Sequence, residues 1–338
     1  MDAFAALSQE EQVARLQRLA ERALGAWELP APRVSLLKYR ENAVFAVQAA
    51  DGRRAVLRIH RPRYRSDLDV RCEVAWMRAL GAAGVETPPV VPTRGGDVLA
   101  TVAAEGVPEP RQCDLMGWVE GQPPGTLEGG VEASADAVRT LYREVGRLAA
   151  RMHAHAEAWK RPEPFSRPRW DAETLMGDAP TFGRFWELPA LTAEQRAVTL
   201  AARDRARVRL AALGPPALLI HGDLVPDNIL VDGAHTRVID FDDFGWSWPG
   251  MELATSIFPL QLSGGFEAGR DGFLEGYRAV RAFPEADLAL LPELLVARGL
   301  SYLGWPVGRP EIHAMQPIVP FLAKSIGEAC RRYLDTRR

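Results

Sequence analysis

Cysteine is scarce in this sequence. The 338 residues include only Cys72, Cys113 and Cys330, and no two of them have the C-x-x-C spacing. Disulfide frameworks and zinc sites need paired or closely spaced cysteines. The sequence therefore predicts neither, and it favours a reducing, cytoplasmic environment.

Long apolar runs and an excess of one charge are also missing. No run approaches the ~20 apolar residues that span a bilayer, and the N-terminal segment lacks the basic and apolar regions of a signal peptide. Lys and Arg number 41 against 44 Asp and Glu, which gives a net charge of −3. We therefore expect no insertion into a membrane and no broad basic surface for nucleic acid.

Three common catalytic motifs do not occur. The absence of G-x-x-x-x-G-K-[ST] argues against a P-loop kinase, and the absence of G-x-S-x-G and H-E-x-x-H argues against the simplest hydrolases and zinc proteases. With 47% hydrophobic and 25% charged residues, the chain is nevertheless a globular protein large enough for two domains.

The secondary-structure pattern changes near residue 120. Residues 8–25 predict a helix that begins with a capping box at Ser8 and Glu11. Short β-type runs follow, interrupted by one helix over 66–80, and beyond 120 the pattern is mainly helical, with a small β-ribbon between 217 and 239. The expected strands are 34–37, 43–48, 54–60, 97–103 and 112–118.

These patterns predict an α+β fold with a small antiparallel β N-lobe and a mainly helical C-lobe. The boundaries we expect are an N-terminal helical extension over 1–30, the N-lobe over 31–119 and the C-lobe over 120–338. The proline- and arginine-rich segment 161–170 predicts a functional loop within the C-lobe.

The segment HGDLVPDN at 221–228, followed by VIDFDD at 238–243, carries the chemistry. It places Asp223, Asn228 and Asp240 at the ends of short strands. Transfer of a phosphoryl group from ATP needs a carboxylate that accepts the proton of the attacking hydroxyl and oxygen ligands that hold Mg²⁺. Any one of these residues could simply accept backbone hydrogen bonds in a turn. Their joint spacing, however, indicates a kinase catalytic loop.

With these motifs, the sequence resembles the aminoglycoside phosphotransferase and choline kinase superfamily, whose members are eukaryotic-like kinases of small molecules. The likeness extends from HGDLVPDNIL and VIDFDDFG into the N-lobe. It implies a bilobal protein-kinase-like fold, ATP as phosphate donor and Mg²⁺ as cofactor. It further implies Asp223 as base, Asn228 and Asp240 as metal ligands, and His221 and Asp242 in support.

The resemblance also implies a nucleotide site on the N-lobe. Arg58 would pair the inner phosphates and be held by Glu73. The backbone around Asn42 would cover the nucleotide, and adenine would contact a linker made of Leu115, Met116, Gly117 and Trp118.

The sequence departs from the family pattern in three ways. Arg58 replaces the usual lysine, no glycine-rich loop covers the phosphates, and Glu252 stands where the family more often has Asp. An arginine fork can still clamp a phosphate. Because all but three of the 41 basic residues are arginines, Arg58 could instead be an ordinary edge residue.

The acceptor is expected to be a hydroxyl of a small molecule, such as an amino-sugar or amino-alcohol. Position 225 is Val rather than the lysine usual in protein kinases, and the segment after Asp240 is too short for a peptide-docking activation segment. Aromatic and acidic residues of the C-lobe could form its pocket or belong to the core, namely Trp246, Trp248, Tyr302, Trp305, Asp242, Asp243 and Glu311.

Two other functions stay open. YRENAVF and ARGLSYLGW also resemble bacterial stress-response Ser/Thr kinases of the same superfamily, and a nucleotide-binding pseudokinase is compatible with Arg58 and the missing glycines.

Overall fold

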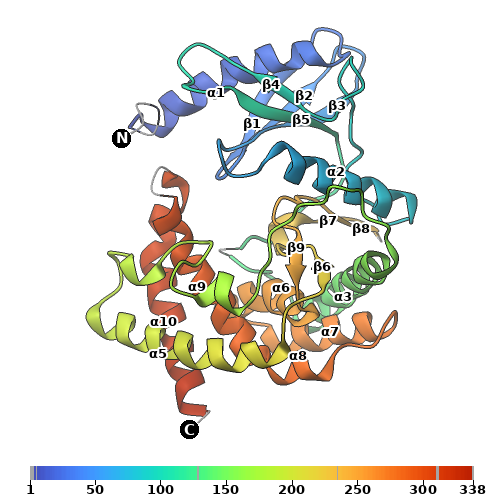
Figure 1. Ribbon diagram of the computed structural model, residues 1–338. Coiled ribbons are helices and arrows are strands. Elements are labelled where there is room, and N and C mark those ends of the chain that lie inside the picture. The colour runs from blue at the N-terminus through green and yellow to red at the C-terminus, as the bar shows by residue number, and fades with distance from the viewer. Residues whose placement is uncertain (1–3, 5, 128, 234, 310–311, 337–338) are drawn as a thin grey trace. The chain divides into compact units, whose positions relative to one another are not determined.

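The computed structural model describes residue 4 and residues 6–127, 129–233, 235–309 and 312–336 (Figure 1). These residues form two compact units. The first contains the chain up to Val119, with Arg161–Ser166 and a short piece near residue 312, and the second contains the remainder.

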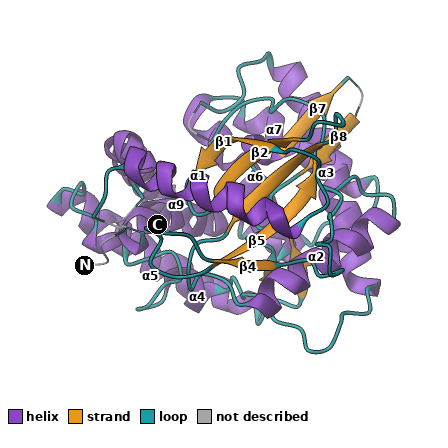
Figure 2. Ribbon diagram, turned by 90° about the horizontal axis from the view of Figure 1, so that it is seen from above, coloured by secondary structure: helices purple, strands orange, loops and turns teal. Residues whose placement is uncertain are grey.

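An antiparallel sheet of five strands, coloured orange in Figure 2, organises the first unit. The five strands expected from the sequence are present, although the run 97–103 is reduced to three residues. The spatial order is β1-β2-β3-β5-β4. The strands are β1 (Arg33–Tyr39), β2 (Ala43–Gln48), β3 (Arg54–Ile59), β4 (Ala100–Val102) and β5 (Arg111–Gly117).

Two helices complete the first unit, and both begin with the capping boxes that their sequences encode. They are α1 (Gln9–Ala23), capped by Ser8, and α2 (Asp67–Ala82), capped by Ser66. Leu19 of α1 is buried in one core with Phe45 and Leu57 of the sheet. Helix α1 is therefore part of the first unit.

The second unit is mainly helical. Its helices are α3 (Ala135–Ala158), α4 (Ala172–Met176), α5 (Ala193–Leu210), α6 (Pro249–Ser263), α7 (Phe266–Arg278), α8 (Glu285–Ala289), α9 (Leu291–Gly308) and α10 (Val319–Thr336). Together with the antiparallel sheet, this helical unit confirms the predicted α+β class. Among the described residues, none of the helices combines the length and apolar character needed to cross a lipid bilayer.

Two ribbons of two strands each carry the acidic loops, where the sequence predicted one. Strand β7 (Ile229–Asp232) pairs with β8 (His235–Val238), and β6 (Leu218–Ile220) pairs with β9 (Gly245–Ser247). The prediction of a single ribbon was wrong. Strand β9 has only three residues, which are too few to show the alternation of apolar and polar residues that identifies a strand.

Glycines let α3 and α7 approach each other closely. A Cβ atom at Gly276 would overlap the backbone carbonyl of Arg143, and one at Gly272 would overlap that of Arg139. The two helices can therefore pack backbone against backbone, which brings His153 of α3 to Tyr277 of α7.

Candidate active site

The loop between β6 and β7 brings Asp223 and Asn228 into direct contact. The Asn228 side-chain nitrogen donates hydrogen bonds to the Asp223 carboxylate Oδ2 at 2.7 Å and to the Asp223 backbone oxygen at 2.9 Å. Because both acceptors are oxygens, the amide nitrogen must face Asp223. The amide oxygen of Asn228 is therefore the atom left for a cation.

The β7-β8 ribbon places Asp240 next to Asn228 along the backbone. Ile229 is paired with Val238, and the N–H of Ile239 donates to the Asn228 carbonyl at 3.0 Å. Asp240 follows directly and has φ of +64°, a left-handed conformation that is strained for a residue other than glycine. The ribbon thus brings the two expected metal ligands to one end of the hairpin.

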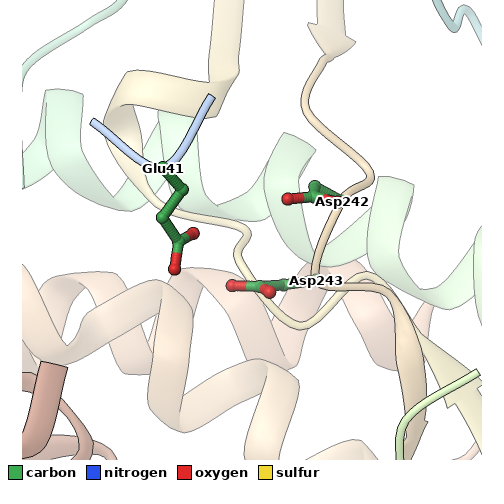
Figure 3. A group of neighbouring side chains, drawn as sticks. All are labelled: Glu41, Asp242 and Asp243. Carbon is green, nitrogen blue, oxygen red and sulfur yellow. The ribbon is translucent and has the colours of Figure 1, made fainter. Parts of the chain in front are cut away.

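Two further carboxylates, Asp242 and Asp243, follow Asp240 in the loop drawn in Figure 3. Figure 3 also draws Glu41, which belongs to the turn between β1 and β2 in the first unit. Asp242 is buried, whereas Asp243 is partly exposed. A buried carboxylate needs a compensating charge or hydrogen bonds. This requirement applies more strongly to Asp242 than to Asp243.

Arg167 and Trp170, from the end of the 161–170 segment, hold this acidic loop by its backbone. The Arg167 guanidinium donates to the carbonyl of Phe244 at 2.7 Å and to that of Asp242, and it stacks on the Phe244 ring at 4.0 Å. Trp170 Nε1 donates to the Asp243 carbonyl at 2.9 Å. Arg167 and Trp170 therefore support the loop that follows Asp240. Ser166, which precedes them in the segment, instead donates a hydrogen bond from its hydroxyl to the Asp69 carboxylate of α2 at 2.7 Å.

Glu252 of α6 holds the backbone at the start of the loop that carries Asp223. Its carboxylate accepts hydrogen bonds from the backbone N–H groups of His221, at 2.6 Å, and of Gly222, at 3.1 Å. Burial alone would raise the pKa of Glu252, but the hydrogen bond and charge of His153, with His221, outweigh burial and lower it.

His221 anchors the loop through both ring nitrogens, as the sequence analysis expected. Its Nδ1 accepts from the backbone N–H of Asp223 at 3.2 Å, and its Nε2 lies 3.2 Å from the Ile239 carbonyl, to which it donates. Nε2 is therefore the ring nitrogen that donates, and Nδ1 is the one that accepts. His221 links Asp223 to the segment that carries Asp240.

His153 was missed by the sequence analysis. It is fully buried on α3, where Nε2 lies 3.3 Å from the Glu252 carboxylate and Nδ1 lies 2.9 Å from the Tyr277 hydroxyl. The available signal was a histidine on the buried face of an amphipathic helix, and that signal does not identify its partner.

In the first unit, Arg58 is a buried ion-pair centre rather than an edge residue. Its guanidinium contacts Glu73 at 2.7 Å, as expected, and also makes a two-point contact with Asp114 at 2.6 and 2.8 Å. His60 Nε2 donates to the same Asp114 carboxylate at 2.9 Å. Burial would raise the pKa of Asp114, but Arg58 and His60 hold it well below its usual range.

Asp114 and His60 were not identified from the sequence. Asp114 is paired with Arg58 in the register of β3 and β5, so the contact follows from neighbouring strands that lie far apart in the chain. A carboxylate within the apolar run QCDLMGW was the signal that could have indicated Asp114.

Other expected nucleotide contacts have local roles in the structure. The Asn42 side-chain oxygen accepts from the N–H of Arg61 at 3.1 Å. Leu115 and Met116 are buried, and the Gly117 N–H donates to the Pro89 carbonyl at 2.6 Å. The expected contact of this linker with adenine stays a prediction.

The expected acceptor pocket stays a prediction, and the residues expected to line it differ in burial. Trp248 is buried and donates to the Gly214 carbonyl at 3.2 Å, and Tyr302 is buried too, so these two belong to the core. Trp246 and Trp305 are partly exposed. Glu311 lies outside the described residues.

Several known proteins are similar to this chain in sequence or in fold. The structure of a microcompartment-associated aminopropanol kinase matches with a TM-score of 0.82 and 29% identity, over 94% of this chain and 98% of that one. Amicoumacin kinase from Bacillus subtilis is 26% identical over 87% of this chain and 84% of the relative. Homoserine kinase from Rhizobium rhizogenes is 25% identical over 67% and 65%.

The sequence profile described as the phosphotransferase enzyme family matches residues 35–289. This match confirms the resemblance drawn from the loop motifs, and the structural likeness confirms the kinase-like fold. The chain belongs to the phosphotransferase enzyme family and is a small-molecule kinase.

Proposed function

We propose that this protein transfers the γ-phosphate of ATP to a hydroxyl group of a small molecule that also carries an amino group, with Mg²⁺ as cofactor. The observation that carries the proposal is the contact between Asp223 and Asn228 at 2.7 Å. Two similar proteins are named homoserine kinase and aminopropanol kinase, and both homoserine and aminopropanol carry an amino group and a hydroxyl group.

Asp223 is the proposed base. Its side chain is 27% exposed, so an acceptor hydroxyl can reach it within hydrogen-bond distance. As the proton passes to the Asp223 carboxylate, the acceptor oxygen bonds to the γ-phosphorus and the bond from that phosphorus to ADP breaks. Direct transfer of this kind requires no covalent enzyme intermediate.

The residues around the loop suit a magnesium ion. The Asn228 amide oxygen and the Asp240 carboxylate are hard oxygen ligands, and Asp242, two residues after Asp240, would support them. When bound, Mg²⁺ would neutralise charge on the phosphates. The hairpin register and the left-handed backbone at Asp240 hold both ligands at one end of the β7-β8 ribbon.

Arg58 is proposed to bind the inner phosphates of ATP. Glu73 and Asp114 orient its guanidinium through three nitrogen–oxygen contacts, and a guanidinium can bind a phosphate through more than one N–H group. The polar turn at Asn42 would cover the nucleotide, and Trp118 would contact adenine. Each of these roles follows from the family resemblance.

The proposal is tested by measuring ADP formation and phosphorylated product over a panel of amino-alcohols, hydroxy amino acids, amino-sugars and nucleosides. Generic protein substrates form a parallel panel. Asp223→Asn is the control variant, because it keeps the shape of the side chain but removes the base. We expect turnover with at least one small amino-alcohol and none in the variant.

Three other outcomes would contradict the proposal. Phosphorylation of protein substrates alone would favour the stress-response kinase. ATP binding with no transfer to any acceptor would favour the pseudokinase. Equal turnover in the Asp223→Asn variant would remove Asp223 as the base.

A further inference from the structure

The carboxylate of Asp223 is held at both oxygens, and the two donors come from different parts of the chain. Asn228 holds Oδ2 from within the loop, and Arg298 of α9 donates from Nη2 to Oδ1 at 2.7 Å. The loop sequence HGDLVPDN contains no lysine or arginine. Among the described residues, the one cation that contacts this carboxylate is therefore supplied by a helix 75 positions further along the chain.

Arg298 is itself buried and oriented. It is 4% exposed, and its guanidinium lies 4.4 Å from the ring centre of Tyr302, one turn along the same helix. Burial alone would lower the pKa of Arg298, but Tyr302 and the charges of Asp223 and Asp243 outweigh it and raise it. Arg298 is thus a fixed cation, and aromatic contact restricts its motion.

Helix α9 is anchored to its neighbours near its beginning. Glu293 contacts Arg209 of α5 at 2.5 Å and accepts from the Tyr333 hydroxyl of α10 at 3.3 Å. Helices α5, α9 and α10 pack against one another (Figure 1). The helix that presents Arg298 is therefore positioned by packing within the second unit.

We propose that Arg298 is a positioning residue for phosphotransfer, which holds the Asp223 carboxylate in the orientation that receives the acceptor proton. The inference rests on the proposed function of Asp223. A carboxylate has about four lone-pair sites. Arg298 and Asn228 occupy one site on each oxygen, so the carboxylate cannot rotate, and the sites that remain are available on its exposed side.

The expected effect is mainly on turnover. A displacement of about 1 Å at a reacting group can cost ~100-fold in rate. Arg298 contacts the base, whereas the proposed nucleotide contacts lie on Arg58 and Trp118 of the first unit. Loss of Arg298 should therefore lower kcat and leave affinity for the nucleotide nearly unchanged.

The test compares Arg298→Met, Arg298→Lys and Arg331→Met with wild type. The methionine keeps the packing against Tyr302 and removes the charge, and the lysine restores a cation with a single donor group. Arg331→Met is the matched control, because it removes a similar contact of the second unit, from Arg331 Nη2 to the Glu194 carboxylate at 2.8 Å, without touching Asp223. Steady-state kcat, KM for ATP, binding of a non-hydrolysable ATP analogue and thermal melting are measured for each protein.

We expect kcat to fall about 100-fold in Arg298→Met and about 10-fold in Arg298→Lys, with analogue affinity within about threefold of wild type. Arg331→Met should keep both its melting temperature and its kcat, because the pair it removes is exposed. Wild-type kcat in a folded Arg298→Met would overturn the inference, as would equal losses of kcat in Arg298→Met and Arg331→Met. A wild-type protein that phosphorylates nothing would overturn the proposed function itself, and this inference with it.

Discussion

The carboxylate of Glu252 accepts a hydrogen bond 2.6 Å long from the backbone N–H of His221. This contact ties α6 to the loop that carries Asp223, since the N–H of Gly222 donates to the same carboxylate. A buried carboxylate that accepts from two adjacent backbone donors fixes the course of the loop and satisfies groups that would otherwise be buried without a partner.

Glu252→Gln is expected to lower the free energy of unfolding by about 2 kcal/mol, because one accepting oxygen becomes an NH₂ group that faces a donor. Turnover should fall as well, since the loop loses its fixed position. Urea unfolding and kcat measure the two effects. A Glu252→Gln variant with wild-type values for both would show that the loop is positioned without this carboxylate.

The buried Arg58-Asp114 pair should matter far more for stability than an exposed pair of the same chemistry. Arg71 makes a two-point contact with Asp97, and both side chains are nearly half exposed. We expect Arg58→Met to cost about 3–5 kcal/mol, because the buried carboxylates of Asp114 and Glu73 would lose the cation that lies between them, and Arg71→Met to cost less than about 1 kcal/mol. Urea denaturation of both variants checks this, and equal losses would contradict it.

Stability should decrease in acid through the same buried carboxylates. The folded protein holds the pKa values of Asp114 and Glu252 below their ordinary values, so the unfolded chain binds protons first as the pH falls. Their contribution is complete above the ordinary carboxyl pKa of about 4 and is lost as the pH falls toward the folded values. Unfolding followed from pH 7 to pH 2 should show a smaller loss in Glu252→Gln than in wild type.

Close packing of α3 and α7 predicts a large penalty at Gly276. A Cβ atom there would overlap the Arg143 carbonyl, whereas a Cβ atom at Gly25 would meet nothing within 4 Å. We expect Gly276→Ala to lower the free energy of unfolding by about 2–3 kcal/mol, since the helices must separate, and Gly25→Ala to be nearly neutral. If both variants unfold at the wild-type urea concentration, the two helices do not pack as described.

Arg167 should affect the metal-dependent part of the reaction. Its guanidinium holds the backbone of the loop that follows Asp240. Arg167→Met should therefore raise the Mg²⁺ concentration needed for half-maximal turnover by about tenfold, because residues that support a metal ligand contribute to metal affinity. Titration of activity with Mg²⁺ at saturating ATP gives the value. An unchanged Mg²⁺ requirement would show that the loop keeps its shape without Arg167.

Local sequence determined the elements and the pairing of Asp223 with Asn228. They are five positions apart in one loop, and the register of the adjoining ribbon brings Asp240 alongside Asn228. The helix starts at Ser8 and Ser66 were equally readable, because a capping box is made by residues three positions apart. Contacts between residues so close together in the chain can be predicted from their spacing.

Tertiary structure alone decided which side chains surround these groups. Asp114 reaches Arg58 because β5 lies beside β3, His153 reaches Glu252 because α3 packs near α6, and Arg298 reaches Asp223 across 75 positions. No periodicity or spacing encodes these contacts. They are set by strand order and helix packing, in which a buried charge must meet its partner wherever the fold places it.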